Sequence, residues 1–277
     1  PVGGTINRLD ETKMMKRIAH SVLWLVLVAW FALIMGFVSK SKADVLCSRL
    51  DIDISDSATV RFITSAQVRE LIGKPEWEVQ GYPLDEIRTR ELEKSLETNP
   101  FIRNAEVFTT VDGVLHVDIL QRTPLMRIMP GGRPGYYLDR EGYILPLKGD
   151  YSPNVLLVTG HIYLSEKTME NGIIPAEPAP GTEAGAEVNM LLDVASYIAG
   201  HPFWKHQVVQ LYRARNGDYE IIPRVGAHQI ILGNLEGYAT KLRNLKLLYD
   251  QGLSRHGWNS YDRINLKYSN QVICKKR

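Results

Sequence analysis

Apolar residues follow one another without interruption near the start of this chain. The stretch "IAHSVLWLVLVAWFALIMGFV", from Ile18 to Val38, contains no Asp, Glu, Lys or Arg. A helix of this length spans about 31 Å, close to the ~30 Å hydrocarbon core of a bilayer. A cleaved signal peptide would have a shorter apolar region and a small-residue cleavage site. The pattern therefore predicts a membrane-spanning helix at 18–38.

Charged residues on the two sides of this run predict its orientation. Four basic residues precede the run: Arg8, Lys13, Lys16 and Arg17. A short basic segment before a membrane helix favours a cytoplasmic N-terminus. We therefore expect a cytoplasmic segment at 1–17 and a single-pass type II protein, with the bulk of the chain on the outer side.

From residue 46 the apolar pattern changes to that of a small folded domain. Leu50, Ile52 and Ile54 alternate with acidic residues, which predicts a half-buried strand. A Thr64-x-x-Gln67 capping box begins a helix, and a second helix is expected from Pro83 to Asn99. Asp112-Gly113 predicts the turn of a hairpin. The predicted order over 46–122 is strand, helix, helix, strand, strand.

The remaining residues, 123–277, predict a mostly antiparallel β domain with flanking helices, so the fold class is α+β. Its predicted elements are a strand at 155–158, a solvated Glu/Pro/Ala/Gly-rich loop at about 165–187, a helix from 188, a hairpin about Asn216-Gly217, a strand at 228–233, a helix at 235–250, and closing strands at 264–268 and 272–273.

Charge and cysteine content narrow the class of protein. The chain has 33 basic and 31 acidic residues and a net charge of +2, so it lacks the large positive charge that would favour binding to nucleic acid. Cys47 and Cys274 are the only cysteines, which excludes a disulfide-dense scaffold. Two separate thiols are expected, with a single bridge in an oxidising compartment as the alternative.

Residues able to carry catalysis form no familiar motif in this sequence. His201 and His206 lack a metal-ligand context, and Asp139 and Glu141 are better explained as part of a glycine-containing turn. Cys274 precedes a basic tail, where lysines could lower the pKa of a thiol. We expect neither an enzyme nor a metal, cofactor or small-molecule substrate.

Three phrases follow the apolar run in this order: "NPFIRNAEVF" at 99–108, "GVLHVDILQRTPLMRI" at 113–128 and "GYYLDREGYILPL" at 135–147. Together they resemble the FtsQ/DivIB family of bacterial cell-division proteins. The matching motif positions are Gln121, Arg122, Pro124, Tyr137, Asp139, Gly142 and Pro146. Near the end, "INLKYSNQVI" is similar to the family's last strands, although Gln271 stands where the family often has Gly. The resemblance covers about residues 14–275 outside the 165–187 loop.

The resemblance implies a POTRA domain at 46–122, a β domain at 123–277, and a scaffold role in the divisome at the septum. It implies that the sheet edge and the helix at 235–250 bind FtsB, itself paired with FtsL as a coiled coil, and that the POTRA domain contacts other division proteins. An edge strand suits addition of a partner strand. The implied partner-binding residues are Tyr249, Ile264, Leu266, Lys267, Tyr268, Asn270, Gln271, Val272 and Ile273, with Tyr249 and Tyr268 as the preferred anchors.

Two other functions stay open at this point. One is a POTRA-bearing factor for envelope assembly or translocation, but 123–277 lacks the succession of alternating strands that such proteins use to form a barrel. The other is an anchored periplasmic enzyme acting on the cell wall. It would need a converging set of carboxylates or metal ligands, as a scan of Asp139, Glu141, His201 and His206 would reveal.

Overall fold

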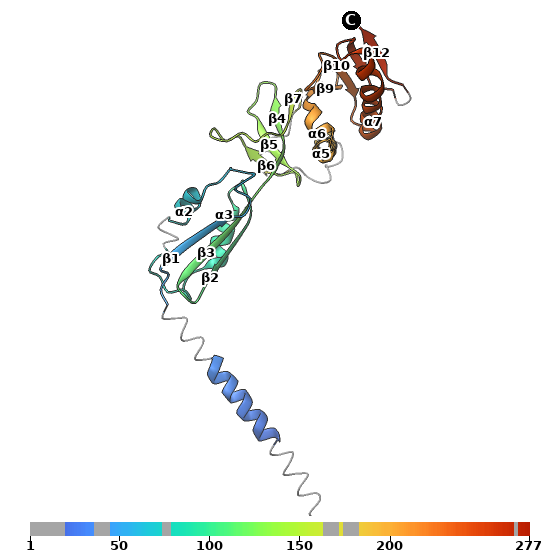
Figure 1. Ribbon diagram of the computed structural model, residues 1–277. Helices are drawn as coiled ribbons and strands as arrows, with labels where there is room; N and C mark the ends of the chain where they lie inside the picture. Colours follow the sequence, from blue (N-terminus) through green and yellow to red (C-terminus); the bar gives the residue numbers. More distant parts are fainter. Residues whose placement is uncertain (1–19, 36–44, 74–78, 163–171, 174–182, 269–270) are drawn as a thin grey trace, which may run out of the picture. The chain divides into compact units, whose positions relative to one another are not determined.

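The computed structural model describes residues 20–35, 45–73, 79–162, 172–173, 183–268 and 271–277 (Figure 1). Contacts between Cα atoms divide the chain into two compact units. The first unit comprises Pro1–Asp53, Ser65–Ser95 and Ala105–Asp118, and the second comprises Ile54–Thr64, Leu96–Asn104 and Ile119–Arg277.

A three-stranded sheet and two helices form the first fold along the chain, in the predicted order of strand, helix, helix, strand, strand. The elements are β1 (Arg49–Ile54), α2 (Ser65–Ile72), α3 (Thr89–Glu97), β2 (Ile102–Thr109) and β3 (Val114–Gln121). The strands lie in the order β1-β3-β2. Gly113 has a φ of 83° in the tight turn between β2 and β3, a backbone conformation that glycine adopts without strain.

Helix α3 begins at Thr89, six residues after the predicted start at Pro83. The backbone around Pro83 is held by another segment: Pro83 forms a bridge with Leu46, and Leu84 N donates to Val45 O over 3.0 Å. These bonds hold Pro83 and Leu84 against the segment before β1, and the chain then turns, with Glu86 N donating to Pro83 O over 3.1 Å, before α3 begins. Within α3, the Glu93 carboxylate accepts from Val107 N of β2 over 2.9 Å, which ties the helix to that strand.

Nine strands form the sheet that dominates the second unit (Figure 1). They lie in the order β12-β11-β10-β9-β8-β7-β4-β5-β6. Their bounds are β4 (Pro124–Pro130), β5 (Tyr136–Asp139), β6 (Ile144–Pro146), β7 (Leu156–Gly160), β8 (Val208–Arg213), β9 (Tyr219–Pro223), β10 (Gln229–Gly233), β11 (Tyr261–Asn265) and β12 (Ile273–Lys276).

Most neighbouring strands in this sheet are antiparallel, as predicted, but β4 with β7, β7 with β8 and β10 with β11 are parallel. A parallel pair requires a crossover connection. Helices provide two of these: α5 (Glu183–Gly200) and α6 (Trp204–Gln207) connect β7 to β8, and α7 (Tyr238–Leu248), the π-helical turn η2 (Tyr249–Leu253) and α8 (Ser254–His256) connect β10 to β11.

The core of the second unit lies between its sheet and its helices. Val194 of α5, Leu242 of α7 and Leu211 of β8 belong to one buried cluster. Val209 and Ile222, which alternate with core positions along their strands, are exposed. Helices therefore cover one face of the sheet in this region, and apolar side chains on the other face remain accessible.

The loop predicted at 165–187 differs from the structure at its end. Residues 183–187 form the beginning of α5, which starts five residues earlier than the predicted helix. Gly172 accepts from Ile144 N over 2.7 Å, and Ile173 bridges Tyr143. The remaining residues of the predicted loop lie outside the described residues.

Residues 20–35 of the predicted membrane span form a helix whose side chains are exposed. Both ends of that span, 18–19 and 36–38, lie outside the described residues. Among the residues that are described, no helix has both the length and the apolar character to cross a membrane.

Candidate partner-binding edge of the sheet

Strand β12 is the terminal strand of the nine-stranded sheet. It pairs antiparallel with β11 through Ile273 with Asn265 and Cys274 with Ile264. On its other side, no strand of the described chain pairs with it. A terminal strand presents unpaired N–H and C=O groups that can pair with another chain.

The direction of the free amides in β12 follows from one hydrogen bond. Arg277 N donates to Ser260 O over 3.3 Å, so this amide faces β11. Successive backbone amides of a strand alternate in direction. The N–H groups of Cys274 and Lys276 therefore face the open edge, whereas that of Lys275 faces β11.

Three of the residues implied as partner-binding are buried in the core of the second unit. Tyr249 is 2% exposed, Ile264 is 0% exposed and Leu266 is 1% exposed. Tyr249 is surrounded by aromatic rings of the chain itself, Phe203, Trp204 and Trp258. These three side chains belong to the core cluster of the second unit and therefore do not present a surface to a partner.

The other implied residues lie on the connection from β11 to β12 or, in the case of Ile273, at the start of β12. Lys267, Tyr268, Gln271 and Ile273 are exposed and Val272 is half-buried. Asn270 lies outside the described residues. The structure thus leaves four of the implied residues exposed and one half-buried between β11 and the start of β12.

Two contacts hold the beginning of this connection in place. Leu266 N donates to Ile231 O of β10 over 2.8 Å, which extends the parallel pairing beyond β11. The Lys267 ammonium lies 2.9 Å from an Asp218 carboxylate oxygen. Tyr268, half exposed, follows directly on this fixed pair.

A buried pair of polar side chains lies behind the edge. His228 Nε2 and the Tyr249 hydroxyl are 2.9 Å apart, and His228 Nδ1 has no hydrogen-bond partner among the described residues. Burial lowers the pKa of His228; the backbone of Trp258 acts in the opposite direction, and the nearby positive charge of Arg277 lowers the pKa further. Burial likewise raises the pKa of Tyr249. Both side chains are therefore held in their neutral forms.

Most of the edge strand itself could not be recognised from the sequence pattern. Cys274, Lys275 and Lys276 were expected in a basic tail, but they form β12 together with Ile273. Burial raises the pKa of the Cys274 thiol, so the expected lowering by neighbouring lysines is not what the structure indicates. Both cysteines are free thiols.

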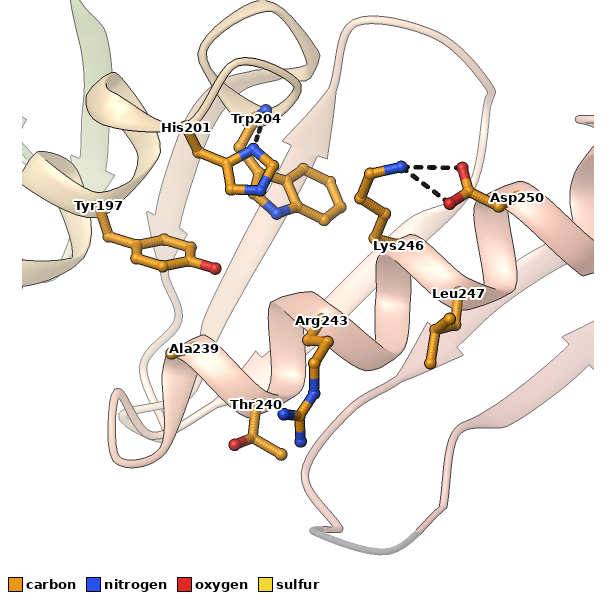
Figure 2. A pocket seen from close by; sticks show the side chains of 9 residues that line it. All are labelled: Tyr197, His201, Trp204, Ala239, Thr240, Arg243, Lys246, Leu247 and Asp250. Carbon is orange, nitrogen blue, oxygen red and sulfur yellow. Dashed lines mark hydrogen bonds and ion pairs between the residues drawn. The ribbon is translucent and has the colours of Figure 1, made fainter.

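The exposed face of α7 borders a pocket of about 460 Å³ (Figure 2). Tyr197, His201 and Trp204 contribute to one side, and Arg243 and Leu247 of α7 to the other. His201 Nδ1 accepts from the backbone N–H groups of Phe203 and Trp204, so this ring serves as a turn cap. Lys246 pairs with Asp250, one turn further along the helix, which neutralises part of the pocket rim.

The motif residues near the start of the second unit have structural roles. The Gln121 amide accepts from Ile63 N over 2.8 Å and donates to Val60 O over 2.9 Å. Asp139 accepts from the backbone N–H groups of Glu141 and Tyr143. The interpretation of Asp139 as a turn residue is therefore confirmed. No group of three or more His, Cys, Asp or Glu able to hold a metal is found in the part of the chain that the structure describes.

Comparisons with known proteins agree with this architecture. A family model described as FtsQ/DivIB, C-terminal related, matches residues 123–275, and a POTRA-like domain model matches residues 45–120. Two curated relatives are both named cell division protein FtsQ. The relative from Salinibacter ruber is 27% identical over 65% of this chain, and that from Rhodothermus marinus is 25% identical over 64%. The aligned region spans 66% and 62% of the length of these relatives, slightly under two thirds.

Proposed function

We propose that this chain, which belongs to the FtsQ/DivIB family, is a non-enzymatic, single-pass membrane scaffold that links bacterial division proteins at the septum. A POTRA-like domain followed by an FtsQ/DivIB-related domain supports this proposal. The apolar run at 18–38 would anchor the chain in the cytoplasmic membrane, with the two folded units on its outer side.

The open edge of β12 carries the proposal. Its outward amides at Cys274 and Lys276 can pair with a strand of a partner, which is the recognition mode called β-augmentation. Tyr268, on the connection that leads to β12, and Ile273, the first residue of β12, are exposed and can supply apolar contact area. Exposed aromatic residues often contribute much of the binding energy at such interfaces.

The charge of the edge indicates the chemistry of the partner strand. Lys275, Lys276 and Arg277 are all exposed. Opposite charges across an interface speed association and exclude wrong partners. We therefore propose that the segment added to β12 is acidic and that it belongs to an FtsB-type protein, itself paired with an FtsL-type coiled coil.

Membrane anchoring would strengthen this interaction. Two partners held in the same bilayer meet at a raised effective concentration, so a weak contact between their outer domains becomes sufficient. The POTRA-like domain would remain free to recruit other divisome proteins.

Titration of the full chain against the outer domain of its FtsB-like partner tests this proposal. We expect Tyr268→Ala to weaken binding at least tenfold while the melting temperature stays unchanged. Tyr82→Ala is the matched control, because Tyr82 is similarly exposed but belongs to the other unit. The proposal is wrong if the folded wild-type chain does not bind, or if both variants bind equally well.

A further inference from the structure

A second pocket, of about 430 Å³, lies where three neighbouring parallel strands begin. It is lined by Leu125 of β4, Leu156 of β7 and Val208 of β8. Ile198, near the end of α5, adds to this apolar lining. Pockets of 300–1,000 Å³ are typical of small-molecule sites, so the size allows a ligand larger than an inorganic ion.

The polar lining of this pocket is basic. Arg140, Lys205, His206 and Arg224 line it, and no Asp or Glu does. Three of these side chains carry a permanent positive charge at neutral pH. Within the part of the chain that the structure describes, none of the four takes part in an ion pair.

The carboxylates nearest to Arg140 in sequence are already engaged elsewhere. Asp139 pairs with buried Arg122, and Glu141 pairs with Arg122 and Arg103. Their charge is therefore balanced by other cations, and among the described residues Arg140 is left without a carboxylate partner. This leaves the pocket with a net positive charge that a ligand can neutralise.

Arg224 is fixed in position by the backbone of α6. Its Nε donates to His206 O over 2.8 Å, and its own backbone N donates to Gln207 O over 2.7 Å. The two terminal guanidinium nitrogens are not used by these bonds. Arginine binds phosphate through such nitrogens in a bidentate manner, and a fixed arginine loses less entropy on binding.

We infer that this pocket binds a phosphate-bearing ligand that also carries an apolar portion. Arg140, Lys205 and Arg224 would contact the phosphate, since three cations match a dianionic group better than a single carboxylate. The apolar portion would lie against Leu125, Leu156 and Val208. No residue of β12 lines the pocket, so this site is independent of the proposed partner edge.

Calorimetric titration of the full chain in a neutral detergent tests the inference with two probes. Dihexanoyl phosphatidic acid represents a lipid source, and phenyl phosphate represents a soluble one. Dihexanoyl phosphatidylcholine, whose headgroup has no net charge, serves as the ligand control. Arg140→Ala and Arg224→Ala are the test variants. Arg243→Ala is the matched protein control, because Arg243 is an exposed arginine that lines the 460 Å³ pocket beside α7 and not this one.

We expect saturable binding of at least one anionic probe, weakened at least tenfold by Arg140→Ala and Arg224→Ala and unchanged by Arg243→Ala. If dihexanoyl phosphatidic acid binds more tightly, the ligand is a phospholipid. If phenyl phosphate binds more tightly, the ligand is a soluble phosphate compound. The inference is overturned if neither probe binds saturably, if phosphatidylcholine binds equally well, or if Arg243→Ala has the same effect as the other two.

Discussion

Arg122 Nη1 and Asp139 Oδ2 lie 3.0 Å apart, and both side chains are almost completely buried. The Arg122 guanidinium also lies over the ring of Tyr143, 3.4 Å from its centroid. Asp139 in turn caps the backbone between β5 and β6. The pair therefore connects the segment before β4 to the turn after β5, within the second unit.

Breaking this pair should strongly destabilise the second unit. Arg122→Leu leaves the Asp139 carboxylate buried without its cation, which costs about 3 kcal/mol in the free energy of unfolding. Urea unfolding followed by near-ultraviolet circular dichroism measures this. Arg103→Ala is the control, since its pair with Glu141 is solvent-exposed and is worth less than about 1 kcal/mol.

A double variant distinguishes the pair from simple packing of Arg122. Asp139→Asn keeps an oxygen for the turn but removes the unpaired charge, so adding it to Arg122→Leu should recover more than half of the lost stability. If the double variant is no more stable than Arg122→Leu alone, the loss comes from packing and the importance of the ion pair is disproved.

The close approach of β7 and β8 at Gly160 should not tolerate a side chain. Gly160 has a φ of 102°, and a Cβ there would lie 2.2 Å from Arg213 O. We expect Gly160→Ala to cost at least about 3 kcal/mol, because strain in the backbone adds to the clash. Gly132 has a φ of 78° with nothing near its Cβ position, so Gly132→Ala should cost only about 1 kcal/mol. Equal losses in thermal melts of the two variants would contradict the close approach.

Acidification should weaken the core behind the sheet edge through His228. Its pKa in the folded protein is lowered from 6.5, so below about pH 6.5 the unfolded chain binds the proton more readily. Stability is therefore complete above this pH, falls as the pH drops towards the folded pKa, and is constant below it. The slope within this window is at most about 1.4 kcal/mol per pH unit.

Replacement of His228 by Gln tests this dependence. Gln keeps a polar group near the Tyr249 hydroxyl but does not titrate, so the melting temperature of the variant should fall less between about pH 7.5 and about pH 5 than that of the wild type. An identical fall in both proteins would show that other groups cause the acid sensitivity.

Short sequence patterns correctly predicted two hairpin turns and one strand, whose conformations depend mainly on the residues within them. Asp112-Gly113 and Asn216-Gly217 predicted two hairpins, and both glycines have the positive φ that such turns require. The alternation at Leu50–Ile54 likewise corresponds to β1. In each case the turn residue or the period of two is itself the physical cause of the structure.

Other features depend on distant parts of the chain and could not be predicted in this way. Strand β12 has two lysines among four residues and no apolar alternation, so its strand conformation follows from pairing with β11. Tyr249 was expected at a partner surface. Apolar spacing along a helix shows that one face will be buried, but it does not show whether the chain itself or a partner packs against that face. The structure covers it with Trp204 and Trp258.

The outward amide of Lys276 offers the most direct test of strand addition. Lys276→Pro removes this N–H without removing a bond to β11, because the inward amides belong to the neighbouring residues. We expect binding of the FtsB-like outer domain to weaken about tenfold with little change in melting temperature. Lys276→Ala keeps the amide and removes only the charge, so it should weaken binding less and reduce its dependence on salt. If Lys276→Pro binds as well as Lys276→Ala, the partner does not add a strand at this position of β12.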